Sequence, residues 1–405
     1  MKKISLIVSL SAAILIVTAA GATAQDLYFG GYARNNTSVL LNDNLDFSQV
    51  QNTFDLKAEY FGDISALNAE VYLNSTGTDE LDAGVKELYM DLYFDSMDLR
   101  IGKQQIIWGK ADGVFITDVV SPKDLSNFVL PDFDEIRMGV SALKADWYLD
   151  AVELELVWVP MFTPSVTPSG LWTTSMPLPP GATINDAVIA DYSLENSEVF
   201  AKVSYMGSAI DVELMGGYMW DDLPVPHMVT LVPSPTFTPQ HHRLLMGGGS
   251  FSTDIAGVII RGEGAYYSGK KFQTSDLSVP EWVVEKGFVH YMAGLDYSLA
   301  GITLGAQFIQ EIILDYDEAM SNNDEFKSTM TFVMAKSFLN ETLMLEFFSY
   351  VGLTNKDALL RPKATYDLAD GLEWIIGADI FIGDSGDFGQ YDDNDLIYTK
   401  IKYSF

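Results

Sequence analysis

The sequence predicts an all-β fold: a single transmembrane, antiparallel, up-and-down β-barrel of about 18 strands, with short turns at one end and long loops at the other. Three observations support this prediction. Many stretches of about 9 to 11 residues, the length that a tilted strand needs to cross a bilayer, alternate between apolar and polar side chains. Their connections are short and long in turn, and the last such stretch ends in Phe405.

The first 24 residues predict a secretory signal peptide. Lys2 and Lys3 precede an apolar run over 4–20, and the small-x-small sequence 22–24 (Ala-Thr-Ala) provides a cleavage site. An uncleaved membrane anchor is the alternative, because the apolar run is slightly long. We therefore expect export through the periplasm and a barrel over 25–405.

Composition favours a membrane barrel over a soluble domain. The net charge is −32, so the chain is not expected to bind nucleic acid or an anionic surface, yet 48% of the residues are hydrophobic. No stretch after the signal has 18 consecutive apolar residues, which argues against a transmembrane helix. In a barrel, apolar side chains face lipid while charged ones face the lumen and the loops.

The alternation is clearest over 50–60. Even positions carry mostly apolar side chains and odd positions carry Gln, Thr, Asp, Lys and Glu, so the two faces of the predicted strand differ in polarity. The same pattern recurs over 67–73, 152–158, 199–205 and 374–382.

The connections predict the strand count. Eight short turns lie near 62–63, 95–96, 149–150, 207–208, 254–257, 299–301, 339–341 and 369–371. Nine mostly longer connections lie around 37–47, 75–84, 108–136, 159–195, 221–242, 269–287, 312–326, 352–356 and 384–394. These connections join 18 strands, an even number that places both chain ends on the side of the short turns. A barrel of 16 strands is the nearest alternative.

The last strand indicates how the barrel is assembled. Ile397, Thr399, Ile401, Tyr403 and Phe405 share one face, which resembles the signal by which outer-membrane barrels are recognised by the barrel-assembly machinery. Aromatic residues near strand ends predict interfacial girdles, with ordinary packing as the alternative: Tyr60, Trp158, Tyr205, Trp220, Trp374 and Tyr403.

The third long loop, 108–136, is the candidate constriction, because a wide barrel keeps a water-filled lumen unless a loop narrows it. Within it, Ser121 is expected to cap, and Pro122 to open, a short helical turn. The residues Arg100-x-Gly-x-Gln104, then Trp108-Gly, then the segment 118–125 (Asp-Val-Val-Ser-Pro-Lys-Asp-Leu) resemble the pattern of the outer-membrane family called domain of unknown function 1302. The resemblance covers 98–137 and implies a porin-like barrel without an established substrate.

Residues in and near this loop are predicted to line the pore. Arg100 and Gln104 share an inward register because Leu99 and Ile101 take the lipid side. Strict alternation places Lys103 outward, with a bulge or snorkelling of its side chain as the alternatives. The candidate constriction residues are Arg100, Gln104, Trp108, Lys110, Asp112, Asp118, Lys123, Asp124 and Arg137, with Lys57, Lys202, Arg261 and Arg361 on inward registers of the wall. Other inward charges are Lys363, Lys400, Lys402, Glu59, Glu70, Glu153, Glu155, Glu213, Glu263 and Asp379. Opposed charges predict a transverse field across the pore; the alternative is that they pair and hold the loop against the wall.

Two further loops, 159–195 and 221–242, are rich in proline and apolar residues. They predict a self-packed plug or lid, with an entrance for a hydrophobic solute or a trimer contact as alternatives. His227, His241 and His242 do not define a zinc site, and the acidic loops 315–324 and 384–395 are expected to form a solvated rim rather than a calcium site. No metal or cofactor is predicted.

These features predict a channel of the bacterial outer membrane for passive diffusion of small hydrophilic solutes, and not an enzyme. The alternative is an uptake channel for amphipathic or hydrophobic compounds gated by the apolar loops. Expected partners are outer-membrane lipid and lipopolysaccharide, the assembly machinery, and a possible homotrimer.

Overall fold

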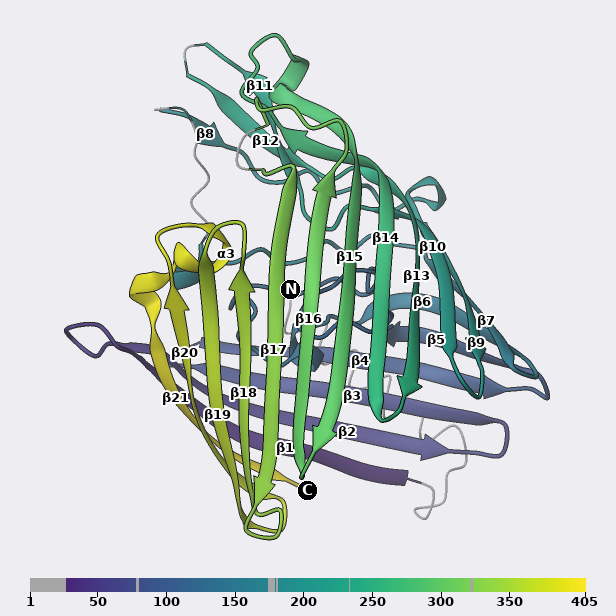
Figure 1. Cartoon of the computed structure of the whole chain (residues 1–405). Coiled ribbons are helices and arrows are strands. Elements are labelled where there is room, and N and C mark those ends of the chain that lie inside the picture. The colour runs from purple at the N-terminus through teal and green to yellow at the C-terminus, as the bar shows by residue number, and fades with distance from the viewer. Residues whose placement is uncertain (1–26, 78–79, 174–178, 180, 233, 321–322) are drawn as a thin grey trace.

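A closed β-barrel forms the body of the molecule (Figure 1). The computed structural model describes residues 27–77, 80–173, 179, 181–232, 234–320 and 323–405. The predicted signal peptide lies outside these residues. None of the helices in the described part of the chain has the length and apolar character needed to span a bilayer.

The wall consists of 18 strands. They are β1 (Leu27–Leu40), β2 (Phe47–Phe61), β3 (Ser65–Thr76), β4 (Glu80–Tyr93), β5 (Met97–Gln104), β6 (Val140–Leu149), β7 (Val152–Val159), β9 (Glu198–Met206), β10 (Asp211–Trp220), β13 (Arg243–Ile255), β14 (Val258–Gln273), β15 (Val283–Leu299), β16 (Ile302–Ile313), β17 (Phe326–Phe338), β18 (Leu343–Gly352), β19 (Asp357–Ala369), β20 (Leu372–Ile382) and β21 (Leu396–Ser404). Each pairs antiparallel with the next wall strand along the chain.

The barrel closes between its first and last strands. β1 pairs with β21 from Tyr32 opposite Ser404 to Leu40 opposite Leu396. Closure leaves the wall no free sheet edge. The predicted fold class and the count of 18 strands are confirmed, and the alternative of 16 is wrong.

The connections agree with the sequence at one end and differ in detail at the other. All eight short turns occur where predicted. The connection expected over 269–287 is shorter, because β14 continues to Gln273 and β15 begins at Val283. Likewise β3 extends to Thr76 and β4 begins at Glu80, so both strands run into the connection expected over 75–84.

The outward face of the wall is apolar. Phe54 is 43% exposed, whereas its chain neighbours Thr53 and Asp55, which face inward, are buried. Leu214, Leu245 and many other outward side chains are also exposed. Such a surface is stable only in contact with lipid or another apolar phase.

The long loops contain structure that the sequence pattern did not predict. Within 160–242, β8 (Thr183–Ile184), β11 (Val225–Thr230) and β12 (Thr236–Gln240) form a separate three-stranded sheet beyond the barrel end opposite the short turns (Figure 1). The short helices are α2 (Phe133–Ile136), α3 (Gly386–Gly389), η1 (Gly170–Trp172), η2 (Leu194–Asn196), η3 (Pro280–Trp282) and η4 (Asp392–Asn394). The helical turn expected after Pro122 is wrong, because Lys123 and Asp124 form extended bridges instead.

Candidate functional site

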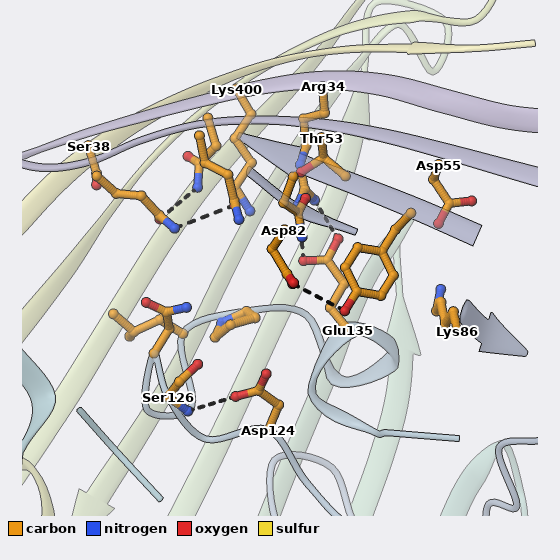
Figure 2. A pocket seen from close by; sticks show the side chains of 18 of the residues that line it. Arg34, Ser38, Thr53, Asp55, Asp82, Lys86, Asp124, Ser126, Glu135 and Lys400 are labelled. Atoms are coloured by element: carbon orange, nitrogen blue, oxygen red, sulfur yellow. Dashed lines mark hydrogen bonds and ion pairs between the residues drawn. The ribbon is translucent and has the colours of Figure 1, made fainter. Parts of the chain in front are cut away.

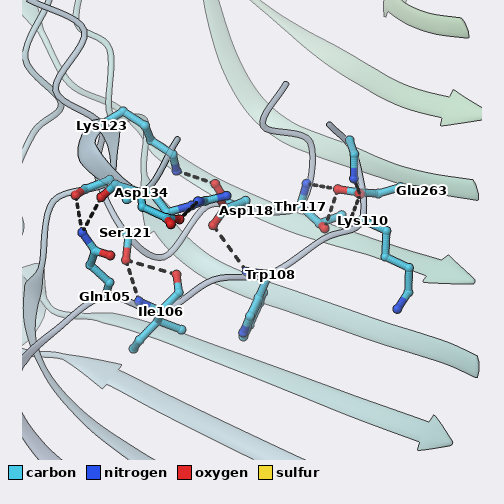
Figure 3. A network of polar contacts seen from close by, with 12 residues as sticks. Gln105, Ile106, Trp108, Lys110, Thr117, Asp118, Ser121, Lys123, Asp134 and Glu263 are labelled. Atoms are coloured by element: carbon cyan, nitrogen blue, oxygen red, sulfur yellow. Dashed lines mark hydrogen bonds and ion pairs between the residues drawn. The ribbon is translucent and has the colours of Figure 1, made fainter. Parts of the chain in front are cut away.

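One wall carboxylate holds the start of the loop between β5 and β6, residues 105–139. Glu263 on β14 is 5% exposed. Its oxygens accept hydrogen bonds from the backbone N–H groups of Lys110 (2.5 Å), Ala111 (2.9 Å) and Thr117 (2.8 Å), and from the Thr117 hydroxyl (2.7 Å; Figure 3). Because three backbone donors converge on one carboxylate, this segment is fixed against the wall.

Trp108 fixes the root of the same loop. Its Nε1 donates to Glu155 Oε1 at 2.6 Å, and its ring packs edge-on against Phe200, with 6.0 Å between ring centroids. Lys202 Nζ lies 3.2 Å from Glu155 Oε2 and 5.4 Å from the centre of the Trp108 ring. Glu155 and Lys202 thus form an ion pair that packs against the aromatic rings of Trp108 and Phe200.

Charged groups also cross-link the loop internally. Arg137 Nε donates to Asp118 Oδ2 at 2.6 Å, and Lys123 Nζ donates to the Asp118 carbonyl (Figure 3). Ser121 Oγ accepts from the backbone N–H of Ile106 at 2.8 Å and donates back to the Ile106 carbonyl at 3.1 Å. Asp118 and Lys123 are almost completely buried, so they stabilise the loop from within.

A second wall cation secures the middle of the loop. Arg261 on β14 contacts Asp112 Oδ2 at 2.6 Å and Asp296 Oδ2 at 2.7 Å, and it donates to the Lys110 carbonyl. Gln307 on β16 accepts from the backbone N–H of Asp112 at 3.0 Å and donates to its carbonyl at 3.1 Å. The opposed charges of Arg261 and Asp112 therefore neutralise each other.

The tip of the loop is held on the other side of the barrel. Arg361 on β19 pairs with Asp379 at 2.7 Å and donates to the carbonyls of Val129 (3.0 Å) and Leu130 (2.5 Å). Phe128 packs among four other aromatic rings, those of Trp172, Phe381, Phe388 and Tyr391.

Apolar packing lies beneath the loop. Ile106, Trp108, Ile116 and Val120 are buried in one cluster with inward-facing wall residues. The wall contributes Val140, Ala142, Val157, Val159, Phe200, Met215, Met219, Leu244, Met246, Ala265, Tyr267, Phe272, Phe288, Met292, Ile309 and Ile313. The loop thus covers an apolar part of the inner wall and removes it from water.

A polar cavity of about 320 Å³ separates the other side of the loop from the wall. Its wall residues come from β1–β5, β20 and β21 (Figure 2). The cationic lining residues are Arg34, Lys86, Lys103, Arg137 and Lys400; the acidic ones are Asp55, Asp82, Asp124, Glu135 and Asp379; Tyr32, Tyr72 and Tyr398 add hydroxyl groups.

The two sides of the cavity carry opposite charge in part. Figure 2 shows Arg34 and Lys400 on wall strands, with Asp124 on the loop beyond them. Arg34 forms a bidentate pair with Glu135 of α2, at 2.5 and 3.2 Å. Burial opposes ionisation of Asp132 on the loop, but the nearby positive charges, chiefly Lys400, outweigh it and lower the pKa of this carboxyl.

Comparison with known proteins identifies the family. A sequence family described as protein of unknown function (DUF1302) matches residues 23–296, more than half of the chain. The chain belongs to the DUF1302 family. No curated protein matches it in sequence.

Solved structures agree on the fold. The DUF1302 barrel is similar to Acinetobacter baumannii OccAB3 (TM-score 0.55, 10% identity, covering 94% of this chain and 99% of that one). It is also similar to Pseudomonas aeruginosa OccK8 (OprE), at TM-score 0.55 and 10% identity over 94% and 98% of the two chains. A third, Pseudomonas aeruginosa OccK5 (OpdH), has TM-score 0.54 and 10% identity over 94% and 98%.

The candidate residues of this DUF1302 barrel separate into three groups. Asp124 and Arg137 line the cavity. Eight contact the wall or the loop around its anchoring points: Trp108, Lys110, Asp112, Asp118, Lys123, Lys202, Arg261 and Arg361. The remaining three lie elsewhere: Arg100 binds Asp91 (2.6 Å), Lys57 binds Glu59 (2.9 Å), and Gln104 is fully buried and donates to the Ala142 carbonyl (3.1 Å).

Lys103 lines the cavity, contrary to strict alternation. Gly102 has φ +134°, and a Cβ there would meet the Leu88 carbonyl oxygen at 2.2 Å, so only glycine fits. This conformation interrupts the alternation and lets Lys103 Nζ donate to the Val85 carbonyl at 2.5 Å. Strict alternation therefore does not hold at Lys103, the position for which a bulge or snorkelling was the predicted alternative.

Sequence reasoning missed Arg34, Lys86 and Glu135, which line the cavity. Arg34 alternates with the outward Ala33 and Asn35, so the register of β1 is a signal that could have found it. Lys86 sits at a bulge where β4 shifts against β3, and Glu135 lies on a loop; neither follows from alternation.

The histidines of loop 221–242 contact one another or nearby loops. His227 Nε2 lies 2.7 Å from His242 Nε2, and His227 Nδ1 lies 2.6 Å from Glu281 Oε2. His241 Nδ1 lies 2.7 Å from the Asp221 carbonyl oxygen. These contacts connect the external sheet to the barrel end.

Proposed function

We propose that this protein is a channel of the bacterial outer membrane through which small hydrophilic solutes diffuse passively. The observation that carries the proposal is the polar cavity inside a wide barrel whose outer face is apolar. An apolar outer face suits the hydrocarbon of a bilayer, and polar side chains around a cavity suit hydrated solutes. The similarity in fold to OccAB3 agrees with this placement.

Loop 105–139 is the proposed constriction. It covers one part of the inner wall and leaves the cavity between its other side and β1–β5, β20 and β21. Lys400 on the wall and Asp124 on the loop supply opposed charges there. Such a transverse field sorts solutes by charge and dipole.

Planar-bilayer conductance tests the proposal. The wild-type protein should give a stable, ohmic open state, and deletion of 112–132 should raise the single-channel conductance because it removes material from the lumen. Removal of a shorter segment outside the barrel, 183–195, serves as the control and should leave conductance nearly unchanged. Equal conductance of wild type and the 112–132 deletion would remove this loop from the mechanism.

A second candidate is uptake of amphipathic or hydrophobic compounds. One observation favours it: apolar side chains on the external loops are strongly exposed, including Leu194 (80%), Tyr192 (77%) and Val232 (77%). Exposed apolar groups collect apolar solutes. A silent protein in the bilayer assay, with detergent or lipid density in the lumen of an experimental structure, would favour this candidate.

The remaining expectations complete the proposal. Residues 1–24 serve as a cleaved signal, and the outer face contacts membrane lipid and lipopolysaccharide. The assembly machinery reads the last strand, whose Phe405 is half exposed and exchanges two backbone hydrogen bonds with Gly31 (3.0 and 3.1 Å). We propose no enzymatic activity and no nucleic-acid partner.

A further inference from the structure

We propose that the outward face of β21, β1, β2 and β3 binds a second copy of this chain. The inference rests on the membrane placement proposed above, because it concerns polar side chains that would otherwise face lipid. The surface is defined by Thr37, Asn35, Asn52 and Ser75, here called the asparagine patch.

The strand register places the asparagine patch on the outer face. Asn35 lies directly opposite Asn52, and Asn52 lies opposite Ser75, so the row crosses three neighbouring strands. The alternate residues Arg34 and Thr53 line the internal cavity. Side chains of successive strand residues point to opposite faces, and the two asparagines therefore point outward.

Apolar outward residues surround the patch on its own strands. Ala33, Phe54, Leu73 and Ile401 flank it. Together with the asparagines, Ser75 and two residues whose side chains line the internal cavity, Arg34 and Thr53, they line a hollow of about 410 Å³. The asparagine patch thus interrupts the apolar outer face with polar side chains. Polar groups in such a belt remain only where another group satisfies them.

The hydrogen bonds within the patch leave the amide nitrogen of Asn52 unused. Asn35 Nδ2 donates to Asn52 Oδ1 at 2.9 Å, and Thr37 Oγ1 donates to Asn35 Oδ1 at 3.1 Å. Within the described chain, Asn52 Nδ2 donates to no acceptor, although an amide nitrogen carries two N–H donors. Acyl chains offer no acceptor for these donors.

A second copy of the chain supplies the hydrogen-bond acceptor that the asparagine patch lacks. A carboxamide is both donor and acceptor, so the same patch on another copy can complete its hydrogen bonds. The asparagine patch contains no ionisable group, and two copies therefore meet there without charge repulsion although the whole chain carries −32. Interfaces within membranes commonly use such uncharged polar side chains.

Another outward polar group offers a control. Tyr291 donates to Gln310 Oε1 at 2.6 Å, and Gln310 Nε2 donates to Ser328 Oγ at 2.9 Å. Both ends of the Gln310 amide thus have partners on neighbouring strands. The Gln310→Leu variant changes an outward amide without touching the asparagine patch.

The experiment measures the protein mass of the purified full-length protein in detergent by light scattering, over a dilution series. Wild type should give a multiple of one chain. The double variant Asn35→Leu/Asn52→Leu should raise the dissociation constant about tenfold or more, because interchain hydrogen bonds are lost, and Gln310→Leu should match wild type. Since the sequence has no cysteine, Asn52→Cys provides a second readout: oxidation in native membranes should give a cross-linked band that Gln310→Cys does not give.

Three outcomes would overturn the proposal: a monomeric wild type, a double variant that associates as tightly as wild type, or lipopolysaccharide that co-purifies with a monomer and is lost in the double variant. The last outcome would assign the asparagine patch to lipid. Single-channel conductance of the double variant is measured in parallel. Normal conductance with unchanged mass refutes the interface and leaves the channel standing, whereas absent conductance in wild type refutes the channel itself.

Discussion

The inner wall of the barrel has two regions of opposite chemistry. Strands β6, β7, β9, β10 and β13–β16 present apolar side chains such as Phe200 and Met246, and these pack against loop 105–139. Strands β1–β4, β20 and β21 present side chains such as Arg34, Asp55 and Lys400, and these line the cavity. The loop is therefore not centred in the lumen, and the wall sequence determines which side it covers.

The difference explains how an irregular loop stays ordered inside a water-filled barrel. Apolar contacts remove Ile116 and Val120 from water, and wall carboxylates and amides take up the backbone N–H groups that a loop cannot pair internally. On the cavity side the loop contacts the wall chiefly through the Arg34–Glu135 pair, and many wall side chains face the cavity instead. Substitutions on the packed side should therefore affect stability, and those on the cavity side should affect permeation.

The largest effect is expected from Glu263→Leu. This change leaves one buried and two partly buried backbone N–H groups without an acceptor, at about 1–3 kcal/mol each with the partly buried ones at the low end, so the free energy of unfolding should fall by about 3–6 kcal/mol. Chemical unfolding followed by tryptophan fluorescence measures the loss, and single-channel recordings should become noisier as the loop is released.

Glu59→Leu is the matched control for this prediction. Glu59 also points into the lumen, but it forms a partly exposed pair with Lys57 and contacts no loop backbone among the described residues. Its replacement should cost less than about 1 kcal/mol. Similar losses in the two variants would contradict the division of the wall into packed and open regions.

A smaller effect is expected from Arg361→Met, at the boundary of the two regions. The variant loses hydrogen bonds to Val129 and Leu130 and leaves Asp379 without its partner, so the free energy of unfolding should fall by about 2–3 kcal/mol. Hydrogen exchange should increase at the loop tip around Phe128. Lys363→Met, on the same strand with a partner in Glu346, is the control; equal exchange in both variants would mean that Arg361 does not hold the tip.

The strand count could be predicted from sequence because its signals are local. Alternation and turn residues belong to neighbouring positions, so 50–60 and each of the eight short turns could be located without knowledge of distant contacts. Alternation fails in β13, which begins Arg-Leu-Leu-Met-Gly, because Leu245 faces outward while Leu244 and Met246 pack against the loop. A strand that is apolar on both faces carries no period-two signal.

The site could be predicted only in part, because its contacts join distant segments. Sequence placed Glu263 inward, but its partner Thr117 lies 146 residues away and no local pattern connects them. The sequence also left two alternatives for the loop charges, a transverse field across the pore or pairs that hold the loop, and only the structure separates them. Asp118 and Lys123 are buried and hold the loop, whereas Asp124 lines the cavity.

The smallest effect is expected from Lys400→Gln, on the wall region that lines the cavity. Lys400 lines the cavity and forms no ion pair in the described chain, so its charge, which also acts on Asp132, remains open to the solution in the cavity. Its removal should lower the anion-to-cation permeability ratio roughly two- to fivefold, as expected for loss of one charge near the solute path, without a change in stability. Reversal potentials across a salt gradient measure this ratio. Asp132→Asn should shift it in the opposite direction, and Lys402→Gln, whose charge lies 3.9 Å from Glu373, should shift it less. An unchanged ratio in Lys400→Gln would mean that ions do not pass between this wall and the loop.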